Sequence, residues 1–159
     1  MDIKSIDKVF HSMAGFVPQR IVLSKITEKA ALVESFDSVL LFADISGFTA
    51  MSERLTSLGK EGAEEVNKII NNFFGPLIKI IYSWQGDIYR FGGDAFLAFF
   101  EETVSARPAS LRAINAAVEI LRFVRKHATT RTKVGSFKIK IHIGLSKGNV
   151  FFKDLASEF

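Results

Sequence analysis

Two acidic residues stand in matching surroundings in this sequence. Asp44 closes an apolar run that begins at Val39, and Asp94 opens another apolar run directly after Gly92-Gly93. Short apolar runs bounded by turn residues predict strands that are buried on both faces, so each carboxylate is expected at the end of a strand. Two carboxylates that meet at one edge of a sheet repel each other, and such a pair either shares a proton or holds a cation.

The residues that follow Asp44 are suited to an anion. Positions 45–49 read Ile-Ser-Gly-Phe-Thr, and a helical pattern starts within them. The free N–H groups at the start of a helix bind anions such as phosphate. A cation-holding acid beside an anion-holding turn matches a metal–nucleotide complex, which favours Mg²⁺ or Mn²⁺, two per site, over a shared proton. Taken alone, Asp44 is more simply read as an ordinary helix N-cap, and the second acid in matching surroundings is what favours the metal.

Hydrophobic periodicity gives the elements that must position these residues. Their order predicts an α+β fold, a ferredoxin-like βαββαβ sandwich with a mostly antiparallel sheet and helices packed on it. A right-handed crossover then sets the first two strands parallel, with the third between them, so Asp44 and Asp94 should meet at one edge. The expected elements are strand 37–44, helices 47–58 and 62–84, strands 88–91 and 94–100, helix 107–127, strand 137–145 and a short strand 148–152.

Length and composition limit the classes of protein that fit. The 159 residues, 48% of them hydrophobic, suffice for one domain, and the lack of cysteine excludes a disulfide framework or a thiolate metal site. The net charge of +4 suits a nucleotide, but the Lys and Arg are spread out, so no nucleic-acid partner is expected. No run is long enough for a membrane span and no signal peptide is recognisable, which favours a cytoplasmic protein. Residues 1–20 predict an amphipathic helix and lead-in, and 21–159 the domain itself.

The combined pattern resembles the catalytic domain of class III nucleotidyl cyclases, nearest to the bicarbonate-responsive soluble adenylyl cyclase group. The resemblance is carried by residues 42–49 (Phe-Ala-Asp-Ile-Ser-Gly-Phe-Thr), 86–88 (Gly-Asp-Ile) and 91–95 (Phe-Gly-Gly-Asp-Ala). It extends from about Pro18 to Val150. The likeness implies a nucleotidyl cyclase type of fold.

The resemblance also implies roles for individual residues. Asp44 and Asp94 would be the side-chain metal ligands, and the carbonyl of Ile45 would join one metal. The triphosphate would lie on the turn, with the Thr49 hydroxyl on a terminal phosphate. The ribose 3′-hydroxyl of ATP would attack the α-phosphate, giving cyclic AMP and pyrophosphate, in a site shared with a second cyclase domain, as a homodimer or an in-chain pseudo-heterodimer. The triphosphate-binding residues would be Ser46, Gly47, Phe48 and Thr49, together with Ile45.

Two departures from the family pattern bear on function. Arg90 stands where adenylyl cyclases of this kind have a base-reading lysine, and Arg offers a fork of donors in place of a point charge, so GTP remains an alternative to ATP. After Val150, only residues 151–159 remain, and they do not contain the Asn and Arg that stabilise the transition state in the family. The domain is therefore expected to be incomplete at its C-terminus, without a complete catalytic set.

Two other functions fit parts of the pattern. The chain could be a cyclase-homology module that binds nucleotide or a partner domain without turnover. It could also be a diguanylate cyclase, because residues 91–96 resemble the GGDEF signature, although Ala95 replaces the expected acid. His142, Lys138 and Lys140 are expected on a solvent-exposed face of a strand, without a role in the site.

Overall fold

The computed structural model describes residues 33–104 and 107–153 of the chain. The amphipathic helix expected near the N-terminus lies outside these residues. The described elements are β1 (Val33–Ser46), α3 (Phe48–Thr56), α4 (Lys60–Ser83), β2 (Asp87–Gly92), β3 (Ala95–Glu101), α5 (Ala109–Lys126), β4 (Thr129–Thr132), β5 (Gly135–Lys138) and β6 (Lys140–Lys153).

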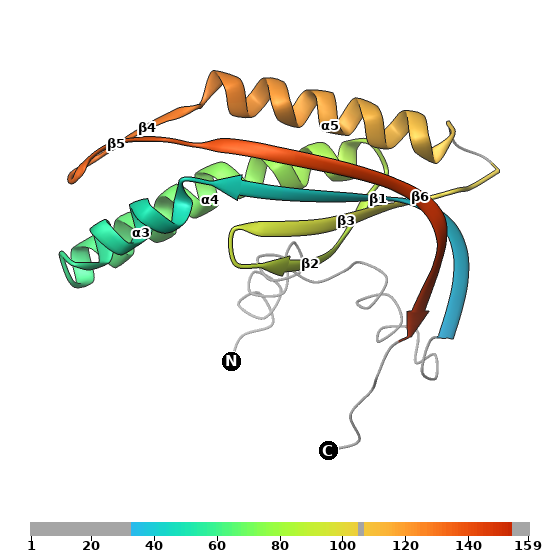
Figure 1. Ribbon diagram of the computed structural model, residues 1–159, viewed down its shortest axis with the longest axis horizontal. Helices are drawn as coiled ribbons and strands as arrows, with labels where there is room; N and C mark the ends of the chain where they lie inside the picture. The colour runs from blue at the N-terminus through green and yellow to red at the C-terminus, as the bar shows by residue number, and fades with distance from the viewer. Residues whose placement is uncertain (1–32, 105–106, 154–159) are drawn as a thin grey trace, which may run out of the picture.

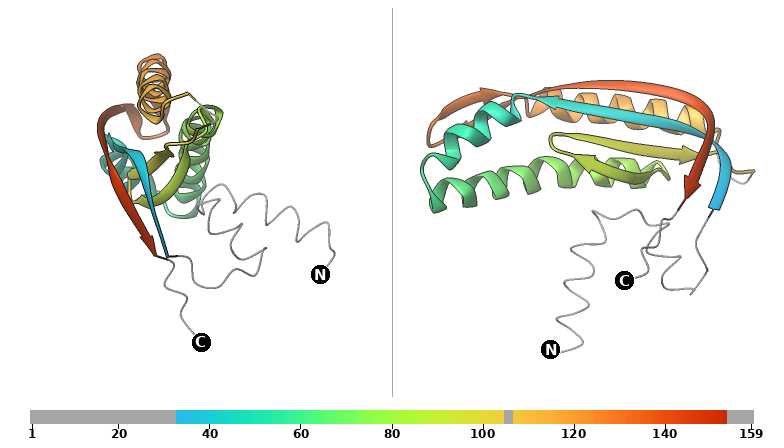
Figure 2. Two further views of the ribbon diagram at one scale, coloured as in Figure 1. Left: turned by 90° about the vertical axis from the view of Figure 1, so that its right-hand side faces the viewer. Right: turned by 60° about the horizontal axis from the view of Figure 1, so that its bottom comes forward.

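Four strands form one sheet in the order β2-β3-β1-β6, and every neighbouring pair is antiparallel. Strands β1 and β2 are therefore parallel to each other, with β3 between them, as the crossover argument predicts. The helices lie together on one face of this sheet (Figures 1 and 2). This arrangement confirms the predicted α+β class and the ferredoxin-like order of its strands.

The core lies between the helices and the sheet because β1 alternates in burial. Leu41, Ala43 and Ile45 are buried toward the helices, whereas Phe42 between them is 52% exposed on the other face. Helix α5 lies close to the sheet because its buried face consists largely of alanine. A cluster of phenylalanine rings from α3, α4, α5 and β2 fills the space around Phe73.

The C-terminal strands differ from the sequence prediction. Residues 137–145 were expected to form one strand. In the structure, residues 137 and 138 belong to the short strand β5, and β6 begins only at Lys140. Ile139 is buried between them, and its N–H donates to the carbonyl of Ala128. Because the segments on both sides of this break are extended, the alternation of apolar and polar residues in the sequence runs across it without interruption. The expected strand 148–152 is the end of the same β6, and the β4–β5 hairpin was not anticipated.

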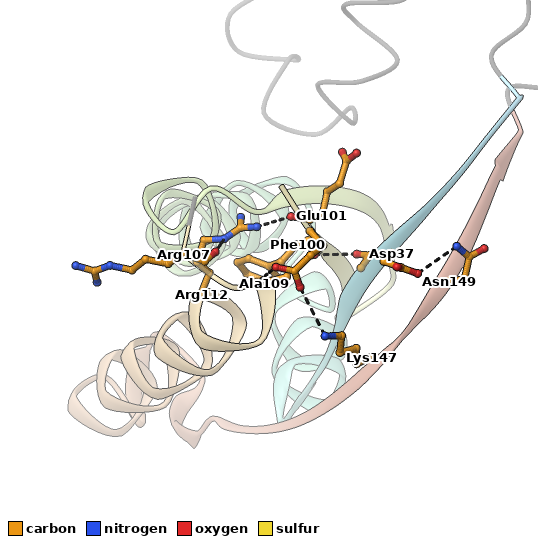
Figure 3. A network of polar contacts seen from close by, with 10 residues as sticks. Asp37, Phe100, Glu101, Arg107, Ala109, Arg112, Lys147 and Asn149 are labelled. Atoms are coloured by element: carbon orange, nitrogen blue, oxygen red, sulfur yellow. Dashed lines mark hydrogen bonds and ion pairs between the residues drawn. The ribbon is translucent and has the colours of Figure 1, made fainter. Parts of the chain in front are cut away.

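A buried arginine fastens α5 to the sheet at the end away from the turn after β1. Arg112 is 4% exposed and donates to the carbonyls of Arg107, Gln85 and Glu101 (Figure 3). Nearby, the carboxylate of Glu102 accepts the N–H of Ala109 and pairs with Lys147 across the sheet. The bonds to carbonyls satisfy the buried guanidinium, so this cluster has a structural explanation.

Candidate active site

Asp44 and Asp94 lie at the same edge of the sheet. Asp44 pairs in register with Ala95, and the N–H of Ile45 donates to the carbonyl of Asp94 at 3.1 Å. Asp94 was expected to begin a strand, but it belongs to the turn before β3, because Gly93 takes a positive φ of 67° and β3 begins at Ala95. A backbone hydrogen bond therefore joins the two segments that carry Asp44 and Asp94, at the sheet edge where the sequence predicts the two acids.

The turn after β1 leads directly into α3 and leaves the start of that helix open. Gly47 caps α3 with φ +98°, a conformation that favours glycine, and makes no side-chain capping bond. A Cβ at this position would lie 2.4 Å from the carbonyl oxygen of Lys138, so the turn packs directly on the end of β5. No side chain caps the first N–H groups of α3, and an anion site at a helix start requires such uncapped donors.

Thr49 holds one of the two acids in place. Its hydroxyl donates to Oδ2 of Asp94 at 2.9 Å. The sequence analysis assigned this hydroxyl to a terminal phosphate, and in this structure it is directed at the carboxylate instead. A side chain in the first turn of α3 therefore orients an acid that follows the β2–β3 hairpin, so the turn and the acids form one unit.

The register of β6 adds two basic residues that the sequence analysis placed outside the site. His142 pairs with Asp44, and Lys140 pairs with Ser46. Cross-strand partners share a face of the sheet with their Cβ atoms about 5 Å apart. Both side chains are exposed, as expected, but they lie beside the turn after β1, which the sequence predicts to bind an anion. No signal in one sequence could place them there, because the register joins strands that are distant along the chain.

Arg90 lies on β2, away from the two acids. It pairs with Leu97, which pairs in turn with Phe42, so these three residues share the face of the sheet opposite the helices. Arg90 is exposed and lines a shallow hollow of about 500 Å³ together with Tyr89 and Gly93. The structure does not bring Arg90 together with Asp44 and Asp94 within one chain.

The donor set at the acid edge fits a divalent metal that also binds phosphate. Within the described residues, no three His, Cys, Asp or Glu side chains gather to form a complete protein cage for a metal. Two carboxylates and a carbonyl next to an open anion site correspond to the way Mg²⁺ is held, by one or two carboxylates, waters and substrate phosphates. The residues present therefore fit a metal that arrives with a nucleotide.

Comparison with known proteins identifies the domain. The family model described as Adenylate and Guanylate cyclase catalytic domain matches residues 32–157. The chain belongs to this family. Cyclic nucleotide synthesis is therefore the activity of the family to which this cyclase domain belongs, and the residue pairs described above lie within the matched region.

Individual relatives include both adenylate and guanylate cyclases. The mouse adenylate cyclase type 10 is 30% identical over 149 residues, which cover 91% of this chain and 9% of that protein. A bacterial light-regulated adenylyl cyclase superposes with a TM-score of 0.71 at 20% identity, over 98% of this chain and 44% of that one. The non-canonical dimeric guanylyl cyclase domain of RhoGC from the aquatic fungus Blastocladiella emersonii gives a TM-score of 0.59 at 25% identity, over 79% and 67%. The cyclase domain thus spans about a tenth of the length of its curated relative.

Among the described helices of the cyclase domain, none combines the length and the apolar character that crossing a membrane requires.

Proposed function

We propose that this cyclase domain binds ATP with two Mg²⁺ or Mn²⁺ ions and forms cyclic AMP and pyrophosphate in a site shared with a second cyclase domain. The observation that carries the proposal is the single unit made by Asp44, Asp94 and the open start of α3. The bonds Ile45–Asp94 and Thr49–Asp94 hold the acids and the turn together. A triphosphate with its metal ions needs both the carboxylates, which hold the metal, and the N–H groups of the helix start, which hold the phosphates.

Each residue of the unit has a definite task in this proposal. Asp44, Asp94 and the carbonyl of Ile45 would hold the metal, which supplies charge neutralisation on the phosphates and a more acidic ribose hydroxyl. The N–H groups of residues 46–49 bind the phosphate oxygens and fix the α-phosphate for in-line attack. Thr49 keeps the carboxylate of Asp94 oriented, and its hydroxyl reaches a phosphate only after turning away from that carboxylate.

The two basic residues of β6 complete the charge balance. The triphosphate and the two carboxylates are all negatively charged, so the metal ions and the helix start need further positively charged or donor groups beside the pyrophosphate that leaves. Lys140 and His142 are placed by register beside Ser46 and Asp44, where the ammonium of Lys140 and an imidazole N–H of His142 would donate to the outer phosphates. We therefore add Lys140 and His142 to the proposed substrate contacts.

The proposed dimer rests on the face of the sheet opposite the helices. Phe42 is 52% exposed there, and none of the described residues covers it. Arg90 shares this face at a distance from the acids of its own chain, so it would contact the base in the site that the partner's acids form. Because Arg presents several donors, Arg90 is compatible with a guanine carbonyl as well as with adenine, and base choice is part of the test.

Binding of 3′-deoxy-ATP in the presence of Mn²⁺ tests the metal and phosphate assignment, because this analogue lacks the hydroxyl that would attack. We expect the wild type to bind, and Asp44→Asn and Asp94→Asn each to weaken binding at least tenfold, since each removes a ligand charge. Asp37→Asn is the matched control: it changes the same kind of residue on β1, among the polar contacts of the opposite sheet end (Figure 3). Calorimetry gives the affinities.

The proposal would be contradicted if the wild type did not bind the analogue, or if Asp44→Asn bound it as tightly as the wild type does. Turnover of ATP and of GTP, measured with a complete partner cyclase domain and with Arg90→Lys, then separates the two bases. Equal turnover of both nucleotides by the wild type and a shift toward ATP in Arg90→Lys would assign base reading to this position.

A further inference from the structure

The β4–β5 hairpin contacts the turn after β1, at Gly47, from outside the proposed nucleotide site. The carbonyl oxygen of Lys138, its last residue, fills the space where a Cβ of Gly47 would lie. The next residue, Ile139, is buried, and Lys140 then begins β6 beside Ser46. The hairpin therefore determines both the support beneath the turn and the starting point of the strand that carries Lys140 and His142.

The hairpin packs against the core through two partly buried side chains, Val134 and Phe137, and is separated from part of the helical layer by a groove. A groove of about 930 Å³ separates it from α4 and from the end of α5, and residues of all three elements line this groove. On its other side the hairpin meets α3, where the guanidinium of Arg54 lies 5.8 Å from the centre of the Phe137 ring. Beside this groove, polar contacts add to the apolar packing of Val134 in joining the hairpin tip to α4.

One residue at the tip makes these contacts. The ammonium of Lys133 pairs with the carboxylate of Glu61, and the N–H of Lys133 donates to Oε1 of Glu65 at 3.3 Å. Both acids belong to the first half of α4. The hydrogen bond with Lys133 lowers the pKa of Glu61, and the same bond raises the pKa of Lys133, so both groups are charged at neutral pH. Figure 1 shows the hairpin at the end of the sheet where β1 meets α3.

We propose that Lys133 is a positioning residue for the nucleotide site: by fastening the β4–β5 hairpin to α4, it holds Lys138 against Gly47 and keeps the phosphate-binding turn in shape. The inference rests on the proposed function for its effect on nucleotide affinity. Its structural part, the coupling of Lys133 to the turn, can be measured without any nucleotide.

The test compares three variants of the full chain. Lys133→Met keeps the alkyl chain and removes the charge, Lys133→Arg keeps the charge, and Lys147→Met removes a similarly exposed lysine from its pair with Glu102 at the other end of the sheet. We expect Lys133→Met to weaken binding of 3′-deoxy-ATP with Mn²⁺ by about two- to fivefold, the range of an exposed ion pair. Lys133→Arg and Lys147→Met should bind as the wild type does.

Hydrogen exchange of the backbone N–H groups of Ile45 and Ile139, which are hydrogen-bonded beside the turn and the hairpin, is measured without nucleotide and is the independent readout. Lys133→Met should accelerate it, and Lys133→Arg and Lys147→Met should leave it unchanged. The inference would be overturned if the exchange rates in Lys133→Met equalled those of the wild type, or if Lys147→Met accelerated exchange to the same extent. If the wild type binds no nucleotide, the proposed function fails, and the exchange rates alone decide whether Lys133 is coupled to the turn.

Discussion

His142 and Asp44 occupy facing positions on β6 and β1. A lone exposed histidine on an alternating strand has no feature that marks it as functional, and the sequence analysis assigned it no role. The reason to consider His142 functional is its cross-strand partner, Asp44. In the proposed function, an imidazole beside the metal-binding carboxylate and the phosphate-binding turn would contact the outer phosphates of a nucleotide and not its base.

At the residue scale we predict that His142→Ala weakens binding of ATP by about three- to tenfold, because a hydrogen bond to a charged phosphate is lost. Binding of AMP should stay within twofold of the wild type, since AMP lacks the outer phosphates. Isothermal titration with both nucleotides checks this. His127→Ala, at the exposed end of α5, serves as the control, and an equal loss of ATP and AMP affinity in His142→Ala would argue against phosphate contact.

Helices α3 and α4 form an element pair that depends on one glycine. Gly62 is buried in the first turns of α4, and a Cβ there would lie 1.7 Å from the carbonyl oxygen of Leu55 on α3. The two helices cross this closely only because that position has no side chain. The crossing sets where α3 begins, and with it the direction of the N–H groups that face the proposed triphosphate.

At the element scale we predict that Gly62→Ala lowers the free energy of unfolding by about 1–3 kcal/mol, because the added methyl group forces the helices apart. Gly75→Ala, in the same helix with no atom within 4 Å of the added Cβ, should change it by less than about 1 kcal/mol. Urea denaturation followed by circular dichroism gives both values. Similar destabilisation in the two variants would argue against the close helix crossing as the cause, because alanine favours a helix more than glycine does.

Considered as a whole, the cyclase domain has one covered and one open sheet face. The helices bury Leu41 and Ile45, whereas Phe42 projects from the opposite face at half exposure. Exposed apolar side chains that gather into one patch mark association sites, and Phe42 shares this face with its cross-strand partner Leu97. The proposed dimer places this face against a second cyclase domain.

At this scale we predict that Phe42→Lys lowers self-association at least tenfold while the free energy of unfolding changes by less than about 1 kcal/mol, because the side chain is already half in water. Analytical ultracentrifugation over a range of concentrations measures the association. Val118→Lys, which changes an exposed apolar residue on α5, is the control. Unchanged association in Phe42→Lys, or an equal loss in the control, would place the contact elsewhere.

The sequence by itself determined the parts of this cyclase domain that depend on neighbouring residues. Alternating and helical periods identified the strands and helices of the main sheet, and the small residues after Asp44 identified the turn. A general rule of handedness then brought Asp94 to the same edge. These features follow from local sterics and from burial, which a pattern of side chains records directly.

Only the tertiary structure decided the contacts that depend on register and on packing between distant segments. The partners of Asp44 and Ser46 on β6, the bond from Thr49 to Asp94, and the β4–β5 hairpin under Gly47 belong to this group. The alternating pattern of residues 137–145 could not show that Ile139 separates two strands, since both pieces are extended. Pairing between strands far apart in the chain is selected by the packing of the whole core, and a local pattern holds no record of it.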